Sequence, residues 1–397
     1  MSLREKTKIP IALQVVCDDI GWFNGDDDRC TNGPSRTGIP RRHAPQDYTA
    51  LNELGRRLNM KIYCPLVLGE WDKDNVLRGM EHATPCEDTW DMKSQIDMNL
   101  AEKCFEAAES SEYIEYGFHG LLHGYWINGV HVADSEFYVP TDRDSKTGLP
   151  LLSRYAPASP DYLESHIDAF FRIYEGWGFK KKIRAFTSPS GMYSDMSANL
   201  AYAGVLKKYG LLYWENGWRE NPMEAVLSGV IFLNNFCVVP WNAYDVDASL
   251  LYDYHIGLHN GITERECACF GTHWPNYLRY NPEKNIDAVN GWVNYYRRHG
   301  NIFGLMLSRD IAFAASQALY YKRLKLDFTD SECIIDANAV DSAGALGVSD
   351  EFYLSFASDI TPRECTGGTV SLYEKHDGFN NYKIKRAKGG DIIKITF

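Results

Sequence analysis

The chain alternates short apolar runs with longer segments whose apolar residues recur at helical spacing. The short runs are rich in Ile, Val, Leu, Phe and Tyr, a composition typical of buried strands. They lie at 11–17, 61–68, 113–118, 183–187, 211–214, 236–240, 267–272 and 302–307. The helix-spaced segments between them include 46–60, 88–110, 159–178 and 197–210. This succession of strand–helix units predicts an α/β fold with parallel strands, either a barrel or a doubly wound sheet.

The pattern changes near the C-terminus. From residue 326 onward the sequence consists of short alternating runs, such as EFYLSFAS and GTVSLYEK, separated by Gly, Asp and Asn. This change predicts two domains: an α/β domain over 1–325 and a small β-sandwich-like accessory domain over 326–397. The second domain is compatible with a role in packing, in oligomerisation or in glycan contact.

Charge and hydropathy exclude some partners. The formal net charge is -12, with 53 acidic against 41 basic residues, which leaves no electrostatic attraction for nucleic acid. No stretch approaches the ~20 apolar residues of a membrane helix. The N-terminal MSLREKTKIPIALQ has no signal-type apolar core, so we expect a cytoplasmic protein, or an exported one if a signal segment has been removed. The ten cysteines are scattered, and we interpret most as buried thiols.

The first apolar run ends in two adjacent carboxylates, Asp18 and Asp19. In a parallel α/β barrel the carboxyl ends of the strands form the mouth where chemistry takes place. The pair would therefore deliver two carboxylates to that mouth. A turn or helix N-cap at the end of the strand is the simpler alternative.

Histidine supplies a second motif. Eleven histidines predict only ~0.3 His-x-x-x-His pairs by chance, yet the sequence contains two, at 119/123 and 255/259. His119 directly follows a predicted strand, so His123 is expected one helical turn further on, where two imidazoles can share a metal. His255 and His259 lie in a segment whose spacing suits a helix on the outside of the fold.

These motifs, in this order, resemble the polysaccharide deacetylase (NodB-homology, carbohydrate esterase family 4) superfamily. The resemblance covers roughly residues 11–310. It implies an irregular (β/α)7 barrel of the glycoside hydrolase and deacetylase type. It also implies that Asp18 is the general base and that Asp19, His119 and His123 bind a divalent metal, most often zinc. The DDIG at 18–21, in place of the usual DDG, marks a divergent member.

Two later segments resemble further motifs of that superfamily. RAFTSPSGMY (184–193) is similar to a loop that lines the substrate groove, which implies substrate contacts for Arg184, Pro189 and Tyr193. ACFGTHWPNY (268–277) is similar to the segment that carries the general acid, which implies that role for His273.

The usual Asp and Trp that support the general acid have no clear counterpart in this chain. Trp241 with Asp245, or Trp214 with Glu215, could take their place. Side chains at strand ends also fit a sugar substrate, and on this ground we assign Glu70, Trp71 and Trp241 to substrate binding.

Together, these features and the resemblance predict a metal-dependent hydrolase, with zinc as the expected metal, that removes an acyl group, above all N-acetyl, from a sugar or related amide. The metal and Asp18 would activate water, and His273 would protonate the leaving amine. Two alternatives stay open. One is a glycoside hydrolase on a related barrel with Asp18 or Glu70 as nucleophile. The other is a carbohydrate-binding protein without catalytic activity.

Overall fold

The computed structural model describes residues 2–21, 39–146, 150–190, 196–215, 226–237, 239, 243–251, 268–387 and 390–397. Its largest sheet has ten strands in the order β11-β12-β10-β9-β4-β3-β2-β14-β13, and β15 also pairs with β2. These strands are β2 (Ile11–Asp18), β3 (Ile62–Leu66), β4 (Ile114–Phe118), β9 (Ala185–Thr187), β10 (Tyr213–Glu215), β11 (Val226–Leu227), β12 (Val230–Leu233), β13 (Asn235–Cys237), β14 (Cys269–His273) and β15 (Leu305–Leu307). All pairs in this sheet are parallel except β11 with β12.

The two ends of this strand order meet in the chain. Only Asn234 separates β12, which pairs with β10, from β13, which pairs with β14. One continuous segment therefore pairs with β10 near one end of the strand order and with β14 near the other end. The irregular (β/α)7 barrel that the family resemblance implies stays a proposal.

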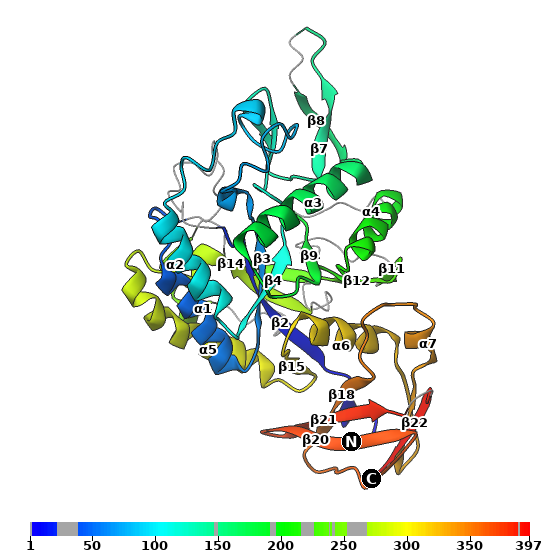
Figure 1. The fold of residues 1–397 in the computed structure, drawn as a ribbon. Coiled ribbons are helices and arrows are strands. Elements are labelled where there is room, and N and C mark those ends of the chain that lie inside the picture. The colour runs from blue at the N-terminus through cyan, green and yellow to red at the C-terminus, as the bar shows by residue number, and fades with distance from the viewer. Residues whose placement is uncertain are drawn as a thin grey trace.

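Helices pack around the large sheet (Figure 1). Those in the α/β part are α1 (Pro45–Leu58), α2 (Met98–Glu109), α3 (Pro160–Trp177), α4 (Met196–Lys208), α5 (Asn285–Gly300) and α6 (Ile311–Arg323). Helix α1 packs against α2 and α5, and α3 packs against α4. Local signals set their ends: the Ser159 side chain accepts from the Tyr162 N–H at the start of α3, and Gly178 ends it with a φ of 79°. No helix in the described part of the chain combines the length and the hydrophobicity that a membrane span requires.

One predicted helix is shorter than expected. The spacing over 88–110 predicts a continuous helix, but α2 begins only at Met98, where the Asp97 side chain accepts from the Leu100 N–H. The preceding segment follows another course that buries Trp90 and Met92 in the core. Apolar spacing alone did not separate this loop from the helix that follows it.

The last part of the chain forms two four-stranded sheets, in the orders β1-β18-β21-β20 and β16-β17-β22-β19. Their strands are β1 (Thr7–Lys8), β16 (Lys325–Phe328), β17 (Glu332–Asp336), β18 (Glu351–Ala357), β19 (Glu364–Thr366), β20 (Gly368–His376), β21 (Phe379–Arg386) and β22 (Ile392–Thr396), with a short helix α7 (Asn338–Asp341). Strand β1 comes from the N-terminus and pairs with β18. The C-terminal sheets share a hydrophobic core with α6 and with the start of β2, below the large sheet in Figure 1.

Between β4 and α3 the chain adds two small hairpins. They consist of β5 (Tyr125–Ile127) with β6 (Val130–Ala133), and β7 (Tyr138–Arg143) with β8 (Pro150–Pro157). The β7–β8 hairpin projects from the end of the molecule opposite the C-terminal sheets (Figure 1). The segment that enters these hairpins carries both histidines of the first His-x-x-x-His pair.

Candidate metal centre

The carboxyl end of β2 carries the two adjacent aspartates. The first seven residues of the strand are buried on both faces, and Asp18 is its last residue. Asp19 leaves the strand with a φ of 57°, the left-handed region that Asp adopts more readily than most residues. This turn brings both carboxylates to the same place, since successive side chains of a continuing strand would point in opposite directions.

His119 follows the last residue of β4, as the sequence predicts. Its Nδ1 lies 2.9 Å from the carbonyl oxygen of Thr187, at the end of neighbouring β9. Because a carbonyl only accepts, Nδ1 carries a proton, and Nε2 is the nitrogen directed to the aspartates. That Nε2 lies 3.1 Å from Asp19 Oδ1.

His123 reaches the same carboxylate from a loop. Its Nε2 lies 3.5 Å from Asp19 Oδ1, and the rings of His119 and His123 are 4.8 Å apart. The expected helical turn between the two histidines is wrong. Residues 119–124 contain no helix, and positive φ values at Gly120 (85°) and His123 (56°) turn the chain back on itself. The four-residue spacing of the two histidines therefore belongs to a tight loop and not to a helical turn.

Asp19, His119 and His123 together form a buried group that could hold a metal ion. One donor atom from each residue lies within 4.8 Å of the other two. Ligand atoms about 2.0–2.1 Å from a tetrahedral metal are roughly 3.3 Å apart, so the distances of 3.1 and 3.5 Å from Asp19 fit such a centre. Burial opposes a charge on His119, but Asp18 and Asp19 outweigh it and raise the His119 pKa to about 9. The surroundings thus favour a cation at this point.

Asp18 lies at the edge of this group. Its Oδ1 is 3.2 Å from His119 Nε2, and its side chain keeps 14% of its surface exposed, against 1% for Asp19. Burial raises the pKa of the Asp18 carboxyl, and the charge of His119 opposes that rise. Asp18 is thus the carboxylate that solvent or a substrate can reach, whereas Asp19 is enclosed.

His273 completes the group from β14. This strand lies beside β2 and pairs His273 with Asp18 in register. The His273 Nε2 lies 3.8 Å from Asp19 Oδ2. Asp245, which the sequence offers as a supporting carboxylate, instead lies 3.8 Å from Arg279 Nε. Trp214, the other suggested support, donates its Nε1–H to Ser188 Oγ at 2.7 Å.

The residues assigned to substrate binding are dispersed. Trp71 is fully buried against Trp177, with ring centroids 4.6 Å apart, and its neighbour Glu70 is also buried. Pro189 is buried just after the end of β9. Arg184 precedes β9, at the opposite end of the strand from Thr187, and donates to the Tyr213 hydroxyl at 2.9 Å. The structure does not bring Arg184 to the metal group.

Several residues named from the sequence lie outside the described residues. They are Tyr193, Trp241, His255 and His259. Their assignments stay predictions.

Sequence reasoning missed two residues that fix His119 and the loop of His123. Thr187 fixes His119 through its backbone carbonyl. Every residue has such a carbonyl, so the residue type at position 187 does not indicate this contact. The buried Glu136 accepts hydrogen bonds from the loop that carries His123. In the sequence, nothing about a glutamate at position 136 signals such a role.

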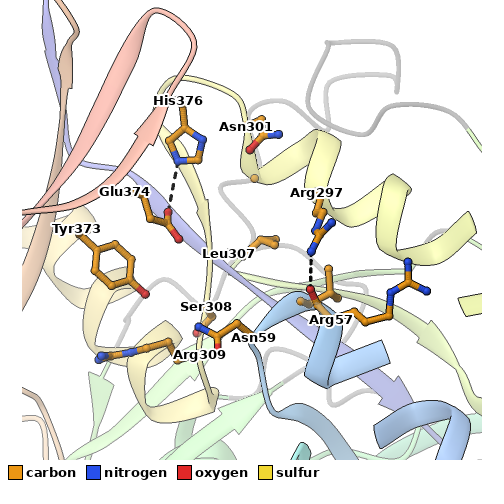
Figure 2. Close-up of a pocket in the computed structure, with 12 residues that line it drawn as sticks. Arg57, Asn59, Arg297, Asn301, Leu307, Ser308, Arg309, Tyr373, Glu374 and His376 are labelled. Atoms are coloured by element: carbon orange, nitrogen blue, oxygen red, sulfur yellow. Dashed lines mark hydrogen bonds and ion pairs between the residues drawn. The ribbon is translucent and has the colours of Figure 1, made fainter. Parts of the chain in front are cut away.

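A separate pocket lies at the other end of β2 (Figure 2). It has a volume of about 230 Å³ and is lined by Arg57, Leu58, Asn59, Arg297, Gly300, Asn301, Leu307, Ser308, Arg309, Tyr373, Glu374 and His376. Its three arginines do not converge. Arg57 donates to Asn290, Arg297 donates to the Arg57 carbonyl, and the Arg309 guanidinium lies over the Phe313 ring. The pocket is therefore a weaker candidate site than the metal group.

A scan against models of protein families finds no match, and a search of curated proteins finds none either. The function is therefore interpreted from the geometry of the site.

Proposed function

We propose that this protein is a metal-dependent hydrolase that removes an acyl group from a sugar or related amide, with N-acetyl as the leading candidate for that group. The observation that carries the proposal is the convergence of Asp19, His119 and His123 on one buried point, with Asp18 and His273 beside it. Two imidazoles and one carboxylate are a donor set that suits zinc. When bound, zinc would supply Lewis-acid chemistry, which lowers the pKa of water and polarises an acyl carbonyl.

The proposed reaction gives Asp18 and His273 opposite tasks. Asp18 would accept the proton of the attacking water, because its carboxylate is accessible and lies next to the ligand His119. His273 would donate a proton to the departing amine, which is otherwise a poor leaving group. His273 and Asp18 are register partners on adjacent strands, so both can reach one bound substrate.

The same geometry gives less support to a glycoside hydrolase. That reaction needs two carboxyl groups across the scissile bond, about 5–5.5 Å apart in retaining enzymes and about 6.5–9.5 Å apart in inverting ones. Asp18 is instead in contact with a histidine of the metal group, and Glu70 is buried.

The proposal is tested by a panel of N-acetylated sugars and simple amides, assayed with zinc-loaded protein and with protein stripped by a chelator. We expect amine release that depends on zinc and is lost in Asp18→Asn. Metal bound without hydrolysis of any amide would favour a binding protein. Cleavage of glycosides by the stripped protein would favour the glycosidase.

A further inference from the structure

The loop that carries the metal ligands closes around a buried carboxylate. Glu136, between β6 and β7, is 1% exposed. Its Oε2 accepts from the backbone N–H groups of Leu121 at 2.8 Å, Leu122 at 3.3 Å and His123 at 3.0 Å. Its Oε1 lies 3.0 Å from the Leu121 nitrogen. Successive N–H groups that face one anion form a backbone nest, which stabilises negative charge.

A histidine from α3 completes the surroundings of this carboxylate. His166 is fully buried, and its Nδ1 lies 2.5 Å from Glu136 Oε1. Burying a carboxylate is costly unless it is hydrogen-bonded and its charge is balanced. The nest and His166 supply the hydrogen bonds that this buried carboxylate needs.

The loop conformation depends on this carboxylate. A Cβ atom at Gly120 would lie 2.4 Å from Glu136 Oε2, and Gly120 has a φ of 85°, so a glycine is required here. His123 has a φ of 56°, a region that is unfavourable for a residue with a side chain. The hydrogen bond from the His123 N–H to Glu136 helps to hold the ligand in that conformation.

We propose that Glu136 is a positioning residue for the metal centre, which holds His123 in the orientation that binds the metal. Its hydrogen bonds to the loop come from backbone N–H groups, so replacing Glu136 removes none of the side chains that would bind the metal. This inference rests on the metal group and not on the hydrolytic reaction proposed above.

The test is Co²⁺ binding by purified full-length protein, followed by the visible absorption of the bound ion. Glu136→Gln replaces an acceptor oxygen with an NH₂ group, which in either amide orientation would face the Leu121 N–H, because both Glu136 oxygens accept from it. We expect Co²⁺ affinity to fall about 10–100-fold and the absorption bands to change, because the geometry around the ion changes. Loss of fold stability alone would not alter the bands of the bound ion.

Glu115→Gln is the matched control. Glu115 lies on β4, and its carboxylate also accepts from a backbone N–H, that of Ile311 at 3.1 Å, away from the metal group. We expect this variant to bind Co²⁺ with the affinity and spectrum of the wild type. Equal losses in the two variants, or an unchanged Glu136→Gln, would overturn the proposal.

A second variant covers the case in which Glu136→Gln does not fold. His166→Gln removes the imidazole and leaves the carboxylate, and we expect a smaller loss of affinity with a change in the bands. Wild-type behaviour of His166→Gln, when Glu136→Gln is unfolded, would also refute the role. If wild-type protein binds no Co²⁺, the metal centre itself fails, which is a different result from failure of Glu136.

Discussion

The Glu115 carboxylate allows a direct test of how β4, the strand that ends just before His119, is packed. It is part of β4, four residues before His119, and its Oε2 accepts from the Ile311 N–H at the start of α6. Burial raises its pKa from 4.5 to about 7, with the Ile311 hydrogen bond opposing that rise. The folded protein therefore holds this proton more tightly than the unfolded chain does.

The sign of the effect follows from linkage. A raised folded-state pKa contributes stability that is complete below about pH 4.5 and is lost as the pH rises through about 7. The difference between 4.5 and 7 corresponds to up to about 3 kcal/mol. The Gln side chain does not ionise, so Glu115→Gln should not lose this stability. Between pH 4.5 and 8 the unfolding free energy of the variant, relative to that of the wild type, should therefore rise by that amount.

Urea unfolding of wild type and Glu115→Gln at several pH values measures this difference, because other titrating groups cancel between the two proteins. Glu53→Gln is the control: Arg56 holds the pKa of the Glu53 carboxyl low, so that difference should stay flat above pH 5. A difference for Glu115→Gln that does not change with pH would refute the assigned burial of its carboxylate.

Further predictions concern the two aspartates and His273. Asp18→Asn should keep the metal and lose turnover, whereas Asp19→Asn should weaken metal binding, as measured by metal content and kcat; the reverse would exchange their roles. His273→Ala should keep metal and fold but lose about 10²–10⁴ in kcat on an amide, with a smaller loss on an activated ester whose leaving group needs no proton. Equal losses on both substrates would remove His273 from the acid role.

The positions of most strands follow from the sequence. Apolar runs bounded by polar residues predict β2, β3, β4 and β14 to within about two residues at each end. Since Asp18, His119 and His273 lie at or just after the ends of such runs, their meeting could also be predicted once the strands were taken as parallel. The local pattern is sufficient to place these three residues, because the end of a strand fixes the position of the side chain that it carries.

The rest of the site depends on contacts that no local pattern encodes. Arg184 lies inside the predicted run 183–187, but β9 begins at Ala185, which places the arginine at the wrong end of the strand for the site. Trp71 meets Trp177, a residue more than 100 positions away, and becomes part of the core. The loop over 119–124 takes its shape from Glu136, so neither its left-handed residues nor its anchor could be read from spacing.

Metal content measured by elemental analysis tests the central claim most directly. Wild-type protein, purified without chelators and supplied with zinc, should contain one metal ion per chain. His119→Ala and His123→Ala should each lose it, because each removes one of three donors. His255→Ala and His259→Ala, which alter the other pair of the same spacing, should retain it. Stoichiometric metal in both His119→Ala and His123→Ala would contradict the account.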